Sequence, residues 1–379
     1  MANLFDYLAS RGGQSLQEAS LNDVDALVLA RLSNLPFDRI VPEDLQNTIT
    51  LAEASRLFFQ SEEAIEKAFF RADLRFLEKA SSCTRFSQMD LCGYTNQIDV
   101  QAEKQFAAMV IRISPALSFV SFRGTDLTLT GWKEDFNMSF CTPIPAQQEA
   151  VRYLNWVAQG LTGELIVGGH SKGGNLSVYA SAFCEPQVQR RIKVIYNLDG
   201  PGFDASVLAS DGYARISTRV KTFIPQSSIV GMLLQHEEDY YVVHSRQIGL
   251  MQHDLFSWEV DEDQLVYVDE VTGRSKFIDS TLKTWLASLS LEEREKFVDT
   301  LFAILEETNA TTLKELTANW HKNAGLVLRS VRELDDEMRH NISHSLSLLF
   351  KAVRQNAQLN VPRPRLLLRT SQTEDDKKP

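Results

Sequence analysis

The chain has 379 residues, of which 44% are hydrophobic and 23% charged, so it has enough apolar material for a folded core. Its formal net charge of −11 argues against nucleic acid as a partner, because phosphate binding depends on clustered lysine and arginine. The sequence has no apolar run long enough to predict a membrane span, and its first residues lack the features of a secretory signal. We therefore expect a cytoplasmic protein without stable membrane insertion.

The four cysteines lack the spacing of a metal site or a disulfide framework. Cys83 and Cys92 could pair in a secreted protein, but ordinary small apolar residues are the simpler interpretation. We expect neither a metal nor a cofactor.

The pattern of residues 1–75 predicts a helical region that packs on the main sheet. Thr50-Leu-Ala-Glu53 has the pattern of a capping box, in which each end residue can bond a free N–H group near the other. Apolar residues continue from it at helical spacing. No catalytic spacing appears in this region.

Residues 76–272 are expected to form the central α/β domain. Two apolar runs, 106–113 and 117–122, are separated by Ser114-Pro115 and predict a hairpin. Further predicted strands cover residues 165–168, 192–198, 220–224 and 240–244, with a helix at 174–183 and a terminal hairpin at 255–260 and 265–268. Strands that alternate with helices indicate an α/β fold with a mostly parallel sheet and helices on both faces.

Residues 273–358 predict a second helical region, and residues 359–379 predict a disordered tail without periodicity. The last helix has an apolar stripe made of Leu328, Val331, Leu334, Met338, Ile342, Leu346 and Leu349. We expect this stripe to pack on neighbouring helices; a helix that binds a partner or a membrane surface is the alternative.

One motif carries the chemistry: Gly169-His170-Ser171-Lys172-Gly173. It follows a predicted strand and precedes a helix, which is the context of the nucleophile elbow of α/β-hydrolases. Side chains two positions before and after the serine would collide with nearby backbone in so tight a turn, and glycine removes them. Ser171 would then stand at a helix N-terminus, where N–H groups favour developing negative charge.

A serine nucleophile needs a base, which in this fold is a histidine late in the chain. His253 lies in a connection between predicted strands, from which a side chain can reach over the sheet edge. His244 lies within a predicted strand whose alternation would bury it, and His236 is a weaker candidate.

The negative charge that develops on the substrate oxygen needs donors. Phe122-Arg-Gly-Thr125 ends a predicted strand, so the loop can present the backbone N–H and hydroxyl of Thr125. The second donor is the backbone N–H of Lys172, directly after the nucleophile.

Over about residues 85–260 the chain resembles the class 3 (fungal-type) lipases. The resemblance rests on three motifs in this order: Phe-Arg-Gly-Thr, Trp-x-x-Asp and Gly-His-Ser-x-Gly-Gly. The whole chain resembles more closely a group of uncharacterised bacterial lipase-like α/β-hydrolases. The resemblance implies Ser171 as nucleophile, Thr125 as oxyanion residue and His253 as base, with acyl esters as substrates and residues 127–145 as a candidate lid. Lys172 replaces the usual leucine of the lipases and is expected to bring a charge near the mouth of the site.

The acid departs from the lipase pattern. The resemblance places it in a segment that here reads Ser228-Ile-Val, without a carboxylate. Asp199, at the end of the strand after the nucleophile helix, is the preferred replacement. Asp239 and Asp254 are weaker candidates, and Asp199 could instead cap the following turn.

The favoured function is a serine hydrolase that cleaves an ester-like bond, in a lipid or another small-molecule acyl ester or thioester, through an acyl-enzyme. A catalytically silent hydrolase fold that acts as an interaction module is the alternative, and the missing acid favours it. A third interpretation is a lipid enzyme bound to the membrane surface through the C-terminal amphipathic helix. The sequence makes no prediction of the oligomeric state.

Overall fold

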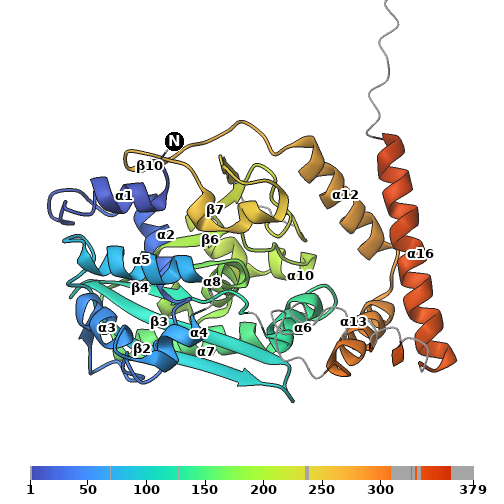
Figure 1. Cartoon of the computed structure of the whole chain (residues 1–379), viewed down its shortest axis with the longest axis horizontal. Coiled ribbons are helices and arrows are strands. Elements are labelled where there is room, and N and C mark those ends of the chain that lie inside the picture. Colours follow the sequence, from blue (N-terminus) through green and yellow to red (C-terminus); the bar gives the residue numbers. More distant parts are fainter. Residues whose placement is uncertain are drawn as a thin grey trace, which may run out of the picture.

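A computed structural model describes residues 2–68, 70–126, 128–234, 239–308, 326, 329–330 and 334–359. Its centre is an eight-stranded sheet whose strands follow one another in chain order (Figure 1). The strands are β1 (Ile49–Thr50), β2 (Asp90–Asp99), β3 (Lys104–Ser114), β4 (Leu117–Phe122), β5 (Glu164–His170), β6 (Ile192–Leu198), β7 (Val220–Pro225) and β8 (Tyr240–Val243). Strands β1 to β4 pair antiparallel and β4 to β8 pair parallel. The predicted α/β class is confirmed.

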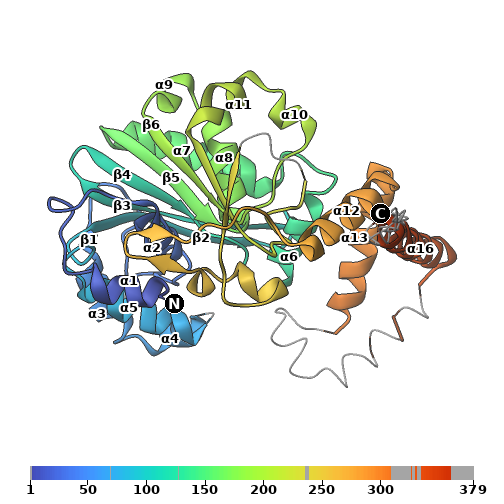
Figure 2. The same ribbon diagram turned by 90° about the horizontal axis from the view of Figure 1, so that it is seen from above.

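Both faces of the sheet are buried, as the alternation along single strands shows. Phe119 and Ile166 point into one hydrophobic cluster, whereas the next residues, Val120 and Val167, point into the other. Successive side chains of a strand face opposite sides, so helices must cover both faces. The views from the side and from above show these two helical layers (Figure 2).

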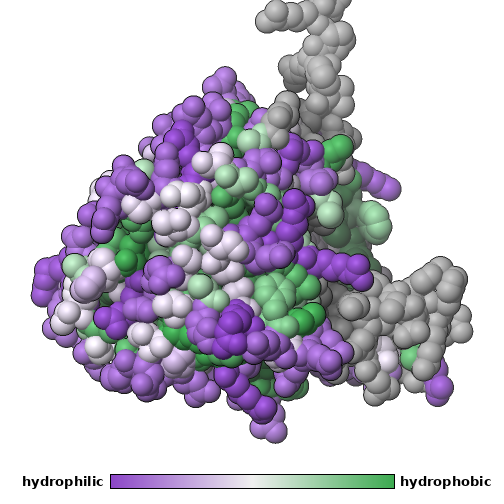
Figure 3. Space-filling view, turned by 60° about the vertical axis from the view of Figure 1, so that its left-hand side comes forward, coloured by the Kyte–Doolittle hydropathy of each residue, from purple (hydrophilic) through white to green (hydrophobic). Residues whose placement is uncertain are grey.

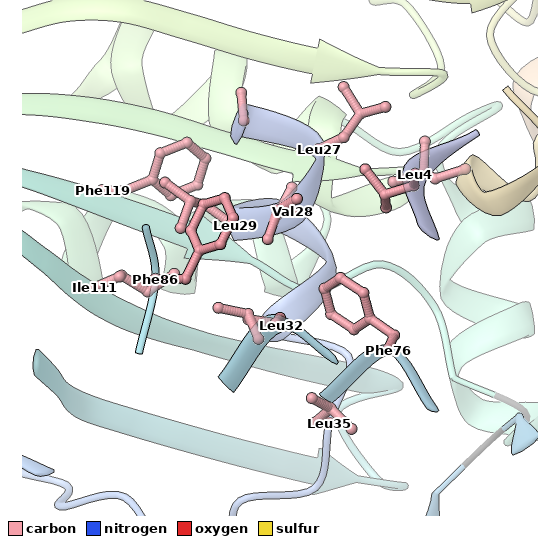
Figure 4. Close-up of a cluster of buried hydrophobic side chains, with 14 of the residues drawn as sticks. Leu4, Leu27, Val28, Leu29, Leu32, Leu35, Phe76, Phe86, Ile111 and Phe119 are labelled. Atoms are coloured by element: carbon pink, nitrogen blue, oxygen red, sulfur yellow. The ribbon is translucent and has the colours of Figure 1, made fainter. Parts of the chain in front are cut away.

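The N-terminal helices cover the first face. They are α1 (Leu4–Ser10), α2 (Asp23–Leu32), α3 (Leu51–Phe58), α4 (Glu62–Lys67) and α5 (Arg71–Ser82). Leu27, Val28 and Leu29 of α2 lie among aromatic and aliphatic side chains of the sheet and of α5 (Figure 4). Helix α5 runs past the predicted boundary at residue 75.

A buried ion pair also holds this layer. Arg85 donates to both carboxylate oxygens of Asp25 in α2, at 2.7 and 2.5 Å, and Tyr7 of α1 donates to Asp25 at 2.7 Å. On the surface, hydrophilic and hydrophobic residues are interspersed in the view that turns the left-hand side of Figure 1 forward (Figure 3).

The opposite face carries α6 (Leu129–Asn137), α7 (Pro145–Gly160), α8 (Lys172–Phe183), α9 (Pro186–Gln189), α10 (Ala205–Leu208) and α11 (Asp211–Ile216). The predicted hairpin of residues 106–122 is confirmed by the pairing of β3 with β4. The terminal hairpin is shorter than predicted, because it consists of β9 (Val260–Asp261) and β10 (Gln264–Leu265). The first half of the predicted strand 255–260 is instead the 3-10 helix η3 (Leu255–Ser257).

The C-terminal helices α12 (Gly273–Ala287), α13 (Leu291–Glu306) and α16 (Asp336–Leu359) form an arm beside α6 (Figures 1 and 2). The predicted stripe of the last helix is only partly core: Met338 is 43% and Leu346 39% exposed, while Leu328 and Val331 lie outside the described residues. The residues of α16 buried against its neighbours include Asn341, Ser345 and Asn356. Asn356 Nδ2 donates to Thr284 Oγ1 of α12 at 3.2 Å.

Across the described ranges, no helix combines the length and apolarity needed to cross a membrane. The four cysteines are free thiols, and Cys83 and Cys92 are both buried.

Candidate active site

Ser171 forms the turn between β5 and α8. Its φ of 59° and ψ of −132° lie where residues other than glycine are rarely found. A Cβ atom on Gly169 would lie 2.4 Å from the carbonyl oxygen of Phe122, and one on Gly173 would lie 2.1 Å from the same oxygen. The turn therefore requires glycine at both positions, for the steric reason that the motif predicts.

This turn lies at the carboxyl end of the parallel strands. The Ser171 N–H donates to the carbonyl oxygen of Leu198 at the end of β6, at 2.9 Å. Helix α8 starts at the next residue, so its positive dipole end lies beside the serine. Thr125, Ser171 and Asp199 follow the carboxyl ends of neighbouring parallel strands, which bring them to one edge.

His253 and Asp199 are in contact. Nδ1 of His253, the last residue of the 3-10 helix η2 (Gly249–His253), lies 2.6 Å from Oδ2 of Asp199. Asp199 is 1% exposed and has a positive φ of 51°, a second strained backbone position beside Ser171. A carboxylate bonded to Nδ1 fixes the tautomer that leaves Nε2 as a base.

The lipase acid position also contributes. Ser228 Oγ donates to Oδ1 of Asp199 at 2.5 Å, and the backbone N–H of Gly231 donates to the same oxygen at 3.2 Å. Both Asp199 oxygens are thus occupied. Sequence reasoning missed this role of Ser228; the only signal was a small hydroxyl residue where an aspartate was expected.

His170 supports the loop that carries His253. Its Nε2 lies 2.7 Å from the backbone oxygen of His253, and the two rings lie 4.4 Å apart. Burial, and secondly the neighbouring His253, lower the pKa of His170 well below its ordinary value. His170 is therefore neutral at pH 7, and its Nε2–H donates to the carbonyl oxygen.

The other candidates lie elsewhere. His244 Nδ1 contacts Glu259 Oε2 at 2.5 Å, and Asp254 accepts from the backbone N–H of Phe256 at 3.1 Å as the cap of η3. Asp239 is exposed, and His236 falls outside the described residues.

The loop after β4 lies against the elbow. A Cβ atom on Gly124 would lie 2.6 Å from the carbonyl oxygen of His170 and 3.1 Å from Cβ of Ser171. The next residue, Thr125, donates its hydroxyl to Oδ2 of Asp135 in α6 at 2.5 Å. Asp135 was not predicted as a site residue, although the Trp-x-x-Asp spacing pointed to it.

The side chain of Lys172 does not bring a charge near the mouth of the site, so that prediction was wrong. Its ammonium is fully buried, not near the mouth of the site, and donates to Glu134 Oε2 of α6 at 2.9 Å. It also donates to the backbone oxygen and Oε1 of Gln105, at 2.9 and 2.8 Å. A lysine four carbons long can turn its charge inward while its backbone N–H stays beside Ser171.

The described part of the candidate lid, residues 128–145, includes α6 and packs against the C-terminal arm. The rings of Phe136 in α6 and Phe302 in α13 lie 5.8 Å apart. Lys133 Nζ lies 3.0 Å from Asp299 of α13, and Arg294 donates to the backbone oxygen of Ser139 at 2.6 Å.

Comparison with solved structures finds lipases. M37 lipase matches with a TM-score of 0.35 and 13% identity, over 55% of this chain and 69% of that one. The protein MDLA of Penicillium cyclopium matches with a TM-score of 0.37 and 14% identity, over 66% and 87%. The Rhizomucor miehei lipase in complex with its propeptide matches with a TM-score of 0.33 and 16% identity, over 45% and 58%, so the chain spans little more than half of it. Scores of this size carry no argument about activity or substrate.

The comparison with curated proteins finds no match. A family model does match, and it covers more than half of the chain, including the elbow, the Thr125 loop and His253. By that match, over residues 80–303, the chain belongs to the Mbeg1-like family.

Proposed function

We propose that this protein is a serine hydrolase that cleaves a lipid or other acyl ester or thioester through an acyl-enzyme, with Ser171, His253 and Asp199 as its triad. The observation that carries the proposal is the 2.6 Å contact of His253 with the buried Asp199, next to a serine in a strained turn. The ring of His253 also lies 4.4 Å from that of His170, the residue before Ser171, which supports His253 as the base.

The proposed reaction has two halves. Ser171 Oγ attacks the acyl carbonyl carbon while His253 Nε2 takes the hydroxyl proton, and Asp199 stabilises the resulting imidazolium. The protonated His253 then gives its proton to the leaving alcohol or thiol as the bond to it breaks. Water attacks the acyl-enzyme in the same way, releases the acid and restores Ser171.

The backbone N–H groups of Thr125 and Lys172 are the proposed donors to the oxyanion. Lys172 follows the nucleophile at the start of α8, and the Gly124 contact brings the Thr125 loop against Ser171. Donors fixed in place before the reaction stabilise charge that develops in the transition state.

The silent-fold alternative depended on the missing acid. The Asp199–His253 contact, with Ser228 and Gly231 on the other carboxylate oxygen, supports the enzyme over that alternative.

Hydrolysis of p-nitrophenyl esters of increasing acyl length tests the proposal. We expect turnover by the wild type, loss of turnover in Ser171→Ala and His253→Ala, and retained turnover in His244→Ala. His244 is a matched control, because it is also a half-buried histidine bonded to a carboxylate. Equal turnover in Ser171→Ala and wild type, or none in any folded protein over the ester series, would contradict the proposal.

A further inference from the structure

Lys172 offers two separate groups: a backbone N–H beside Ser171 and a buried ammonium that faces α6. We propose that the Lys172 side chain is a positioning group, which holds α6 through Glu134 and keeps Asp135 as the acceptor that orients Thr125. This inference rests on the proposed hydrolase function, and it deepens the account of its oxyanion site.

The Lys172 ammonium makes hydrogen bonds to two elements. Its three hydrogens match three acceptors within 2.9 Å: two oxygens of Gln105 in β3 and Oε2 of Glu134 in α6. The ammonium and the Glu134 carboxylate are both 0% exposed and lie 2.9 Å apart, whereas Asp135 Oδ1 lies 3.9 Å from the ammonium, so Glu134 is its nearest charge partner. Lys172 therefore joins the start of α8 to the sheet and to α6.

Glu134 fixes the position of α6. Its Oε2 also accepts from the backbone N–H of Gln105 at 3.0 Å, and its Oε1 accepts from the backbone N–H of Ala146 at 2.8 Å. One carboxylate thus binds β3, α7 and Lys172. These contacts set the position of α6 and of the next residue, Asp135.

Asp135 contacts the loop that carries Thr125. Asp135 Oδ2 accepts from the Thr125 hydroxyl, while its buried Oδ1 has no hydrogen-bond partner and lies 3.9 Å from Lys172 Nζ. The charged groups that act on it are Lys172, which favours its anion, and Glu134 and Asp126, which oppose it.

The Asp135 carboxylate is protonated more readily than that of an ordinary aspartate. Burial is the largest cause that raises its pKa, to about 6, and the attraction of Lys172 is the largest effect in the other direction. Without the ammonium, more of Asp135 would be protonated at pH 7, and a protonated carboxyl can donate to Thr125 instead of accepting from it. The leucine that the lipase pattern has at this position supplies no such charge.

The test uses the rate at which a fluorophosphonate probe labels the protein between pH 5 and 9. In Lys172→Met/Glu134→Gln both charges are removed together, so that no unpaired charge stays buried. We expect its labelling to be about tenfold slower at pH 7, less than the roughly 10²–10³-fold loss on removal of a whole oxyanion donor, and the acid limb of the pH profile to move to higher pH. In an Asp135→Asn background the same two substitutions should cause no further shift. Lys104→Met, next to Gln105, controls for loss of a cation and should keep the wild-type profile.

Each outcome has one meaning. If the folded wild type is not labelled at any pH, the proposed hydrolase function fails. If the wild type is labelled and the folded double variant keeps its rate and profile, the positioning role fails and the function stands. If the double variant does not fold, the Asp135→Asn variant alone tests the proposal. A wild-type labelling rate and pH profile in that variant would overturn the role of Asp135.

Discussion

At the residue scale, the candidate site keeps a carboxylate on its histidine although the lipase position for it holds Ser228. Asp199 bonds His253 through one oxygen and Ser228 through the other. Asp199 was a candidate from sequence because it ends a strand at the edge where Ser171 stands. Its bond to Ser228 was not predictable, because it joins two loops that are 29 residues apart in sequence.

Asp199→Asn should separate catalysis from folding. The amide cannot stabilise a protonated His253 and favours the wrong tautomer, so we expect ester hydrolysis to fall by about 10³–10⁴-fold. Ser228→Ala removes one donor to Asp199 and should cost about tenfold or less, the size of a single hydrogen bond. Steady-state kinetics of the two folded variants measure both. An Asp199→Asn enzyme within tenfold of wild type would contradict the assignment.

His170 predicts a dependence of stability on pH. Its pKa in the folded protein lies well below its ordinary value, mainly because of burial, so below pH of about 6.5 the unfolded chain binds more protons. The free energy of unfolding should therefore fall as the pH drops from 7 to 5. His170→Asn retains a donor for the His253 carbonyl but removes the titration, so its decrease should be smaller. Urea unfolding at both pH values measures this, and identical decreases would count against a neutral buried His170.

At the scale of elements, periodicity predicted the regular segments and missed those that depend on distant contacts. Strand β2 was not predicted, because its second half has polar side chains at Thr95, Asn96 and Gln97 that resemble a loop. Its pairing with β3 supplies the order that local sequence does not show. In α16 the apolar stripe predicted a helix correctly but not which side is buried, since that depends on α12 and α13.

The buried pair that joins α6 to α8 makes a prediction about stability. Lys172→Met alone leaves Glu134 buried without its cation and should cost about 3–5 kcal/mol of the free energy of unfolding. Adding Glu134→Gln should recover most of this loss, because an amide is far less costly to bury than a charge. Denaturant unfolding of the two variants tests the coupling; equal losses in both would mean that the pair is not coupled.

At the scale of the whole molecule, the order of the strands accounts for how much of the site was predictable. Thr125, Ser171 and Asp199 follow β4, β5 and β6, and parallel neighbours end at the same edge. The strand order therefore puts at one edge the three residues that the motifs and the lipase resemblance assign to one site. The inward turn of Lys172 and the packing of α6 on α13 depend on residues from four separate elements, and no local pattern records them.

The central claim is that Ser171 is a nucleophile activated by His253 and Asp199. Its most direct test is mass spectrometry of the full-length protein after exposure to a fluorophosphonate, with the modified peptide sequenced. The account predicts one adduct, on Ser171, formed far more slowly in His253→Ala and absent in Ser171→Ala. A folded protein that stays unmodified, or an adduct on another residue, would contradict it.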